Sequence, residues 1–545
     1  MNNTEKTNIL ILPALIVVTP FLVFLNYNSY CLSCAETWIA LGGLIAMAMI
    51  CSMIMLFGGW RMRSLIMAML ITFFIDIPVT PWNLLDRTAI LLFAGTQTFV
   101  LCLFLKDKFY TIVTVVFLTF FVVTVFQLSV AANKNDPPFE HHKSSVHAPQ
   151  RIIHLILDEH IGIEGIPTDI DGSIAIKNLI AQFYFKNGFQ LFGGAYSHYF
   201  RTHTSIGNML NFAAESNSTA LISGRGPHIL LRNEYFKLLS AKKYHIEVLS
   251  PGWMDYCSES LVVINACIQK RWSTLNNFAK LELPVSQKLQ VLYSRYLNQS
   301  SIVAAAIYAV VLPFQSKFPA LAPSISQWIW AFSPDRTHTD SLNVLVDLKV
   351  LWSDILSLPH GTILFAHLLL PHYPYVAQSD CSVRPTNRDF LWNSRGLFKP
   401  PSTNTIESRK ERYQQYFEQL GCLYLRLDDL FDRMRAAGIY EDSIIVLHGD
   451  HGSRIVLSEP TLENQLTLTK QDLVDGFSTL FAMKLPGKKG GYDASPWPLE
   501  QLFAKFAFEA GLSPTSFLPE KSEPYVYLTA DDDKEFIRIP YISPE

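Results

Sequence analysis

Long apolar runs dominate the first 130 residues of the chain. Each run approaches the length of about 20 residues that a helix needs to cross the hydrocarbon core of a bilayer. A cleavable signal peptide would be a single such run. The third run is the least regular, because Asp76, Pro78 and Pro81 interrupt it. The pattern therefore predicts a helical transmembrane domain of about five spans over residues 1–130, and the expected spans are Ile9–Tyr27, Thr37–Phe57, Ser64–Leu84, Thr88–Leu105 and Phe109–Val130.

The charges between these runs predict how the chain is oriented. Arg61 and Arg63 lie between the second and third runs, and Lys106 and Lys108 lie between the fourth and fifth. The loop at 28–35 contains neither Lys nor Arg. Because positively charged loops stay in the cytoplasm, five spans leave the N-terminus inside and export the chain that follows the last span.

Beyond residue 150 short apolar strands alternate with longer segments of helical periodicity, such as Arg412–Ala437. The expected strands are Arg151–Leu157, Tyr244–Leu249, Thr362–Leu370, Ser443–Leu447 and Ser478–Leu485. This alternation favours an α/β domain over residues 151–545, with a largely parallel central sheet covered by helices on both faces. The polar segment 131–150 is expected to be a linker, and Tyr525–Thr529 with Phe536–Ile539 to form a C-terminal hairpin.

Composition narrows the functional classes. Hydrophobic residues make up 49% of the 545 residues and charged residues only 17%, which suits a membrane-embedded protein. The net charge of −3 and the lack of a basic face studded with aromatic residues argue against a nucleic-acid partner.

The cysteines divide by their place in the chain. Cys51 and Cys102 lie inside expected spans, whereas the other six lie in segments placed outside the cytoplasm, where disulfides form. The preferred pairs are Cys257 with Cys267 and Cys381 with Cys422. Cys31 and Cys34 pair in the same way or form a redox or metal site, and we assign them no function.

One expected strand is followed by residues whose side chains suit a metal ion. The apolar run Ser443–Leu447 leads to Asp450 and His451, which have Gly449 and Gly452 on either side. A carboxylate beside an imidazole suits a borderline cation, and the glycines permit a close approach of the backbone to a bound ion or phosphate. The alternative is a strand that ends in a polar glycine turn.

Three further segments carry reactive groups close to the expected strands. Asp158 and Glu159 follow the first strand, and His372 follows the third. The segment 194–211 presents three hydroxyls, those of Thr202, Thr204 and Ser205. Because open α/β sheets bind ligands at the carboxyl ends of their strands, we expect these groups to share one site. Such a set suits metal-assisted attack by a hydroxyl on a phosphoryl or sulfuryl centre.

The order of these segments resembles the alkaline phosphatase and sulfatase superfamily, in particular its membrane-anchored branch of lipid A phosphoethanolamine transferases and lipoteichoic acid synthases. In the transferases a strand ends in an acidic metal ligand, Thr-x-x-Ser opens a helix, a His precedes a Pro, and Asp-His-Gly completes the metal site. The matching segments, within 151–487, are Ile156-Leu157-Asp158-Glu159, Thr202-His203-Thr204-Ser205-Ile206, His372-Tyr373-Pro374 and Asp450-His451-Gly452.

The resemblance implies a role for each matching residue. Thr202 is the expected nucleophile, with Thr204 and Ser205 as its competitors, and His372 binds substrate or protonates a leaving oxygen. The implied metal ligands are Asp158, Glu159 or both, together with Thr202, Asp450 and His451. The implied cofactor is a divalent cation, Zn²⁺ or Mn²⁺, with Ca²⁺ or Mg²⁺ also open.

Two histidines near the motifs, and three departures from the family pattern, qualify these roles. His367 is expected to be a core histidine, and His448 is similar, although its closeness to Asp450 leaves open a role behind the metal ligand. The transferases carry a further His beyond Asp-His-Gly that is absent from 453–468, where Arg454 is a candidate anion-binding residue instead. Gly207 stands where the family usually has a proline, and the sulfatase motif Cys/Ser-x-Pro-x-Arg is missing.

The resemblance implies a multi-pass protein of the bacterial plasma (inner) membrane whose catalytic domain faces the periplasm. The expected activity transfers a phosphoethanolamine- or phosphoglycerol-like group from a membrane lipid donor to an envelope glycan or lipid through a covalent threonine intermediate. The alternatives are a hydrolase of phosphodiesters or sulfate esters with the same site, and a non-catalytic envelope protein that retains the fold.

Overall fold

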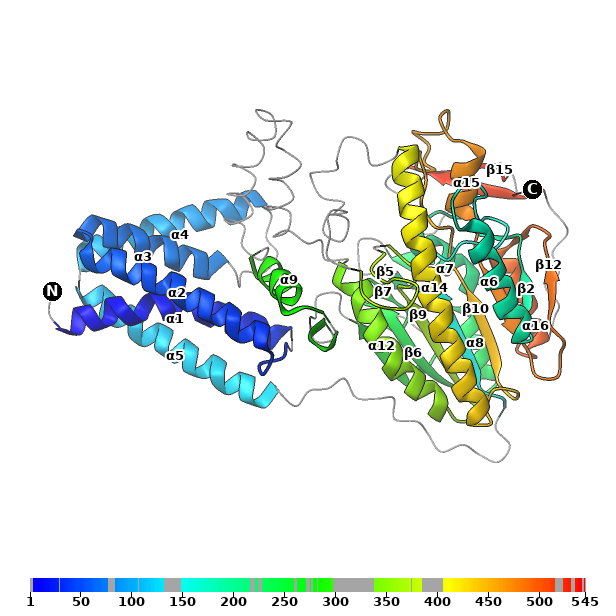
Figure 1. Ribbon diagram of the computed structural model, residues 1–545, viewed down its shortest axis with the longest axis horizontal. Coiled ribbons are helices and arrows are strands. Elements are labelled where there is room, and N and C mark those ends of the chain that lie inside the picture. Colours follow the sequence, from blue (N-terminus) through cyan, green and yellow to red (C-terminus); the bar gives the residue numbers. More distant parts are fainter. Residues whose placement is uncertain are drawn as a thin grey trace. The chain divides into compact units, whose positions relative to one another are not determined.

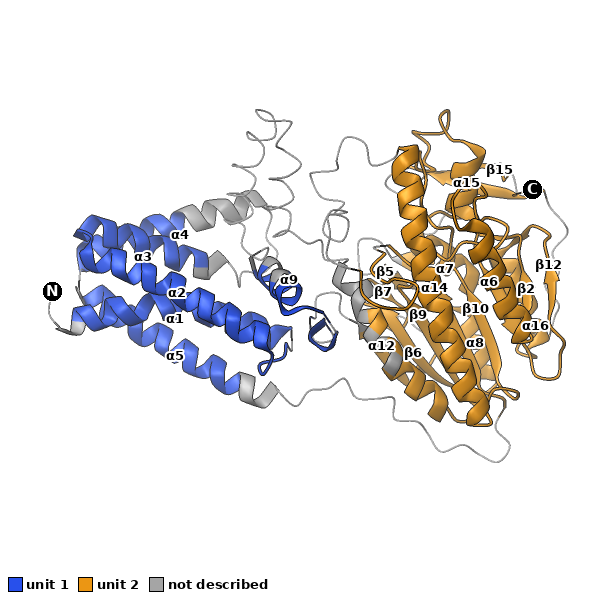
Figure 2. Cartoon of the chain, in the orientation of Figure 1, with its two compact units in different colours: residues 1–136, 273–336, 386–396 blue, residues 137–272, 337–385, 397–545 orange. Residues whose placement is uncertain are grey.

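The computed structural model describes most of the chain. The described residues are 3–28, 30–76, 84–105, 107–131, 149–215, 221–223, 228–258, 262–270, 275, 278–281, 283–297, 338–373, 375–384, 405–514, 523–530, 535–541 and 544. The chain divides into two compact units, coloured separately in Figure 2. The first comprises residues 1–136, 273–336 and 386–396, and the second comprises the remainder. The predicted linker lies almost wholly outside the described residues.

Helices make up the first unit (Figure 1). In chain order they are α1 (Asn3–Tyr27), α2 (Ala35–Phe57), α3 (Trp60–Asp76), α4 (Leu84–Leu105) and α5 (Asp107–Ala131), followed later by α9 (Val285–Leu297). Within the described residues three segments are long and apolar enough to cross a membrane: Glu5–Tyr27, Ala35–Phe57 and Lys108–Gln127. The expected count of five spans is therefore not confirmed. Residues 77–83, where the third expected span ends, lie outside the described part.

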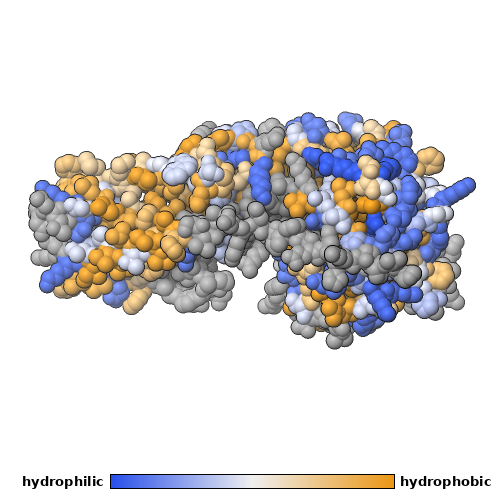
Figure 3. Space-filling view, turned by 90° about the horizontal axis from the view of Figure 1, so that it is seen from below, coloured by the Kyte–Doolittle hydropathy of each residue, from blue (hydrophilic) through white to orange (hydrophobic). Residues whose placement is uncertain are grey.

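The surface of these helices is apolar. Large side chains such as Phe57, Phe104 and Phe126 are exposed, and Figure 3 shows hydrophobic residues gathered over this unit. Exposed apolar surface of this extent is unfavourable in water and suits contact with lipid. At one end Arg63 Nη1 lies 3.2 Å from Glu5 Oε1, which places the start of α1 beside the α2–α3 connection. The two segments therefore lie at the same end of this helical unit.

Helix α9 comes from far along the sequence and packs among the N-terminal helices. The ring of Tyr296 is fully buried and lies 5.1 Å from that of Phe21 in an edge-to-face contact. Tyr293 donates its hydroxyl proton to the carbonyl oxygen of Ala40 at 2.9 Å. The first unit is thus completed by a segment that follows β8 in the chain.

The second unit contains an eight-stranded sheet with the order β12-β2-β11-β10-β1-β9-β6-β8. Among these strands β11 is antiparallel to both of its neighbours, and the other five pairings are parallel. The expected α/β class and the largely parallel sheet are confirmed. The bounds are β1 Ile152–Leu157, β2 Gln190–Phe192, β6 His245–Pro251, β8 Ala266–Lys270, β9 Thr362–Leu368, β10 Ile444–His448, β11 Phe481–Lys484 and β12 Gly491–Asp493.

Helices cover both faces of this sheet, as Figure 1 shows. One face packs on α7 (Thr202–Leu210), α8 (Glu234–Ala241) and α16 (Leu499–Glu509), in a core that includes Ile152 and Ile156 of β1. Because successive side chains of a strand point to opposite faces, Ile153 and Leu155 project to the other side. Helices there are α6 (Ser173–Lys186), α12 (His338–Ser357) and α14 (Ile406–Ala436). Burial on both faces explains why β1 and β9 read as continuous apolar runs.

Smaller elements complete the second unit. Strands β14 (Tyr525–Thr529) and β15 (Phe536–Pro540) pair antiparallel as the expected hairpin. The remaining elements include β3 (Ala195–Tyr196) with β13 (Trp497–Pro498), the three-stranded sheet of β4 (Ile222–Ser223), β5 (His228–Leu230) and β7 (Met254–Asp255), and α15 (Lys470–Phe477). Both preferred disulfides form, and Cys31 pairs with Cys34 as well. Cys51 and Cys102 are free.

Candidate active site

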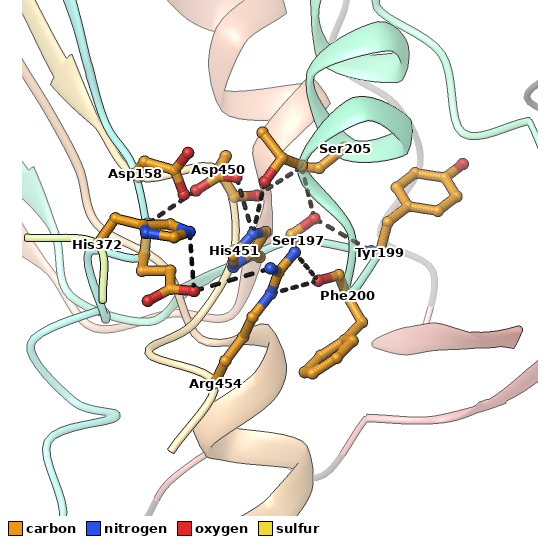
Figure 4. Close-up of polar contacts among 12 residues, drawn as sticks. Asp158, Ser197, Tyr199, Phe200, Ser205, His372, Asp450, His451 and Arg454 are labelled. Carbon is orange, nitrogen blue, oxygen red and sulfur yellow. Dashed lines mark hydrogen bonds and ion pairs between the residues drawn. The ribbon is translucent and has the colours of Figure 1, made fainter. Parts of the chain in front are cut away.

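The ends of neighbouring parallel strands bring the candidate residues together. Asp158 directly follows β1, and Asp450 and His451 lie just beyond the end of β10, which pairs with β1. One ligand atom from each of these three side chains lies within 4.8 Å of the others, and all three side chains are fully buried. Figure 4 shows them converging. The structure thus brings three of the predicted site residues together at the ends of β1 and β10.

The backbone conformation at Glu159 directs the side chains of Asp158 and Glu159 to different parts of the site. Glu159 has a φ of 63°, a left-handed conformation that is unfavourable for a residue with a Cβ. Two hydrogen bonds hold it there: its N–H donates to Asp450 Oδ1 at 3.0 Å, and its carbonyl oxygen accepts from the Tyr416 hydroxyl at 2.8 Å. Asp158 consequently points to the cluster with Asp450 and His451, whereas the carboxylate of Glu159 lies beside His372.

Thr202 is the first residue of α7, and its hydroxyl faces the cluster. Its Oγ1 lies 2.9 Å from Nε2 of His451, and its side chain is almost fully buried. The N-terminus of a helix carries a partial positive charge that favours nearby anions. Ser205 instead donates its hydroxyl proton to the carbonyl oxygen of Asp450. Of the hydroxyls of Thr202 and Ser205, that of Thr202 is the one that contacts the imidazole of His451.

The protonation of His451 follows from its contacts. Its Nδ1 lies 2.9 Å from the carbonyl oxygen of Gly452, and because that oxygen only accepts, Nδ1 carries a proton. In the neutral imidazole Nε2 then presents a lone pair to Thr202, which donates its hydroxyl proton. The same lone pair lies 2.9 Å from Oδ2 of Asp450. Two acceptors at this distance repel each other unless a proton or a cation lies beside them.

The two aspartates differ in their electrostatics. Burial, together with the nearby charge of Asp450, raises the pKa of Asp158 to about 7. Burial also pushes the pKa of Asp450 upward, but the positive charges of neighbouring cationic groups, above all His451 when it is protonated and then His367 and Arg454, outweigh burial and hold that pKa well below its ordinary value. Two buried carboxylates whose pKa values are pushed apart in this way are a feature of functional sites.

A divalent cation fits this site by the chemistry of its donors. Asp158 Oδ1 is buried and has no hydrogen-bond partner among the residues that the structure describes. A buried carboxylate oxygen without a partner is costly, and a cation would satisfy it. Asp158, Asp450, His451 and the Thr202 hydroxyl would hold the ion, and this mixture of oxygen and nitrogen donors suits Zn²⁺ or Mn²⁺.

Glu159, His372 and Arg454 form a second group. Figure 4 shows His372 and Arg454 of this group beside Asp450 and His451. Glu159 Oε1 lies 3.4 Å from Nε2 of His372 and 3.7 Å from Nη1 of Arg454, and Oε2 accepts from the Tyr373 N–H at 2.9 Å. Arg454 also donates from Nε and Nη2 to the carbonyl oxygen of Phe200, at 3.1 and 2.9 Å. The guanidinium therefore holds the loop that leads into Thr202.

Sequence reasoning missed one contact behind Asp158. His367 of β9 is buried, as expected of a core histidine, but its Nε2 donates to Asp158 Oδ2 at 3.0 Å. The signal was its position opposite Ile156 in the register of β1 and β9, close to the strand ends. His448 of β10 instead contacts His154 on the neighbouring strand β1, with the two Nε2 atoms 2.7 Å apart.

The glycines of the Asp-His motif permit a close approach between segments of the protein. A Cβ on Gly452 would overlap the backbone of Asp475 and Gly476, and one on Gly449 would overlap Thr479 and the carbonyl oxygen of His160. The close approach is thus between segments of the protein itself. It packs the loop after β10 tightly and so fixes the direction of the side chains of Asp450 and His451.

Comparisons with known proteins give similarity in structure only. No protein-family model matches the chain, and no curated protein sequence matches it. The C-terminal periplasmic domain of EcEptC from Escherichia coli is 12% identical, covers 75% of this chain and 97% of that one, and has a TM-score of 0.40. The phosphonate monoester hydrolase SpPMH from Silicibacter pomeroyi is 12% identical over 70% of this chain and 79% of that one, with a TM-score of 0.39.

A third similar structure is a protein in the alkaline phosphatase superfamily from Vibrio parahaemolyticus. It is 8% identical, covers 72% of this chain and 75% of that one, and has a TM-score of 0.37. The EptC domain is also known in complex with Zn, at a TM-score of 0.38.

Proposed function

We propose that this protein is a membrane-anchored, metal-dependent enzyme that transfers a phosphoryl-containing group through a covalent intermediate on Thr202. The observation that carries the proposal is the position of the Thr202 hydroxyl, 2.9 Å from His451 Nε2 at the N-terminal end of α7. A buried hydroxyl at a helix N-terminus, next to two carboxylates and an imidazole, suits a nucleophile that attacks an anionic phosphorus centre.

Thr202 and His372 act in two successive transfers of the phosphoryl-containing group. Asp158, Asp450, His451 and Thr202 would hold a divalent cation, which would lower the pKa of a bound hydroxyl and offset negative charge on the phosphoryl oxygens. Thr202 loses its proton to solvent, and its Oγ1 forms a bond to phosphorus while the bond from phosphorus to the donor's alcohol oxygen breaks. His372 gives that oxygen a proton. In the second transfer an acceptor hydroxyl gives its proton to His372 and attacks phosphorus, and Thr202 leaves and recovers a proton from solvent.

Arg454 and the membrane unit support a lipid-linked phosphodiester as donor. The guanidinium of Arg454 lies beside the loop that leads into Thr202, and its side chain is 15% exposed, so a phosphate oxygen can reach it. Apolar helices would hold the site close to lipid donors and so raise their effective concentration. An envelope glycan or lipid facing the periplasm would then be the acceptor, with the enzyme in the bacterial plasma membrane.

The products of the full chain in detergent test the proposal. With mixed phospholipid micelles and Zn²⁺ or Mn²⁺, we expect diacylglycerol and a modified acceptor, measured by mass spectrometry, and no product from Asp450→Asn. Free phosphoethanolamine or phosphoglycerol without a modified acceptor would identify a hydrolase with the same site. Wild-type protein that yields neither product would contradict the proposal and favour the non-catalytic alternative.

A further inference from the structure

A row of three side chains lies behind the metal cluster and ends at Asp158. His367 Nε2 lies 3.0 Å from Asp158 Oδ2, and His367 Nδ1 lies 2.7 Å from the hydroxyl of Tyr256. Asp158 is 0% exposed, Tyr256 is 1% exposed and His367 is 3% exposed. Water therefore does not compete for these two hydrogen bonds, and each side chain keeps a single partner on each side.

The chemistry of the groups sets the direction of both hydrogen bonds. An ionised carboxylate only accepts, so the proton of the neutral imidazole lies on Nε2 and points to Asp158. Nδ1 is then an acceptor, and Tyr256 donates its hydroxyl proton to it. The row thus runs from the tyrosine hydroxyl through the imidazole to Oδ2, which leaves Oδ1 without a hydrogen-bond partner among the described residues and available to a cation.

Packing holds the imidazole in this orientation. The indole of Trp253 meets the ring of His367 at 5.9 Å between centroids in an edge-to-face contact, and Phe365 meets Tyr256 in the same way at 5.1 Å. His367 lies on β9, whose register places it opposite Ile156 on β1, two residues before Asp158. A rotation of the His367 ring would break both hydrogen bonds and the contact with Trp253.

We propose that His367, supported by Tyr256, is a positioning residue that makes Asp158 a ligand through Oδ1 alone and orients it before the cation binds. Because Oδ2 is engaged by His367, Asp158 is not free to chelate with both oxygens. Partners of this kind behind a metal ligand typically change metal affinity by about 10- to 100-fold when they are removed. This inference rests on the metal site of the proposed function, but not on the transfer reaction.

Metal binding by the full chain in detergent tests the inference. We would measure the dissociation constants of Zn²⁺ and Mn²⁺ by competition with a chelator, and the visible absorption spectrum after loading with Co²⁺. His367→Phe removes the donor, and we expect its affinity to fall by about 10- to 100-fold with an altered cobalt spectrum. His367→Gln keeps an N–H near Oδ2, and we expect it to recover part of the loss.

Tyrosine variants provide a matched comparison. Tyr256→Phe removes only the outer hydroxyl, and we expect a loss of affinity of a few-fold, smaller than that of His367→Phe. Tyr235→Phe is the control, because Tyr235 is equally buried and its hydroxyl has no hydrogen-bond partner among the described residues. We expect Tyr235→Phe to keep the wild-type affinity.

Two results would overturn the inference. One is a wild-type affinity and cobalt spectrum in both His367→Gln and Tyr256→Phe. The other is an Asp158→Asn variant that binds metal with the affinity of the wild type. If His367→Phe does not fold, His367→Gln and Tyr256→Phe still test the inference. Wild-type protein that binds metal through His367-supported Asp158 but forms no product would refute the proposed function and leave this inference intact.

Discussion

The hydroxyl of Thr202 lies 2.9 Å from Nε2 of His451, although 249 positions separate the two residues in the chain. The contact exists because α7 begins at the edge of the sheet where β1 and β10 end. His451 directs a lone pair to this hydroxyl because its other nitrogen donates to Gly452. The predictions below concern the groups that hold this pair in place.

Replacement of Arg454 should slow turnover without unfolding the protein. In Arg454→Gln the bidentate contact with the carbonyl oxygen of Phe200 is lost, and the loop before Thr202 loses its support. We expect a decrease in kcat/KM of about 10- to 100-fold, because small errors in the position of a nucleophile are costly. The control is Arg433→Gln, which removes an exposed pair with Asp429. Equal rates in the two variants would contradict a role for Arg454.

The two acidic residues after β1 should differ in their effect on metal binding. Asp158→Asn is expected to reduce metal content after dialysis, because Asp158 belongs to the cluster with Asp450 and His451. Glu159→Gln is expected to retain the metal but to turn over slowly, because Glu159 contacts His372 and the N–H of Tyr373. Elemental analysis and a phosphodiester assay on the same samples separate the two effects. Loss of metal in Glu159→Gln alone would reverse the assignment.

The metal-free protein should lose stability as the pH rises towards neutrality. The folded-state pKa of Asp158 is raised to about 7, above its ordinary value near 4. The folded protein thus binds a proton that the unfolded chain releases, so this contribution is complete below about pH 4 and is lost as pH rises through about 7. Chemical unfolding with chelator present should show a decline in wild type that Asp158→Asn lacks. Parallel pH curves for the two proteins would contradict it.

Gly452→Ala should damage both stability and activity. The new Cβ would overlap the backbone of Asp475 and Gly476, which is less able to move than the end of a side chain. We expect the free energy of unfolding to fall by about 1–3 kcal/mol, and turnover to fall because His451 is displaced. Denaturant unfolding measures the first effect. Wild-type stability would show that the loop after β10 is more adaptable than its packing indicates.

The sequence was sufficient for the architecture of the α/β domain. Strands β1, β9 and β10 are apolar on both faces, and each is followed by a polar residue or motif, so their place in a buried parallel sheet could be predicted. The same logic places Asp158, Asp450 and His451 at one edge. Two of the disulfides could also be predicted, because Cys257 with Cys267 and Cys381 with Cys422 form the preferred pairs.

Other features depend on geometry that sequence patterns do not encode. The left-handed backbone of Glu159 separates its side chain from that of Asp158, and a Glu at such a position carries no sequence signal. His367 lies inside an apolar run, so its hydrogen bond to Asp158 depends on the register of β9 against β1. Tyr296 contacts Phe21 although about half of the chain lies between them, and the segment that carries Tyr296 has no motif that indicates this packing.

The central claim is that Thr202 carries the transferred group. The most direct test is the intact mass of the full chain in detergent after incubation with mixed phospholipids and Zn²⁺ or Mn²⁺, beside Thr202→Ala. We predict an adduct on the wild type, absent from the variant, whose mass identifies the transferred group and whose fragmentation places it on Thr202. An adduct that persists in Thr202→Ala, or turnover of phospholipid by that variant at the wild-type rate, would contradict the claim.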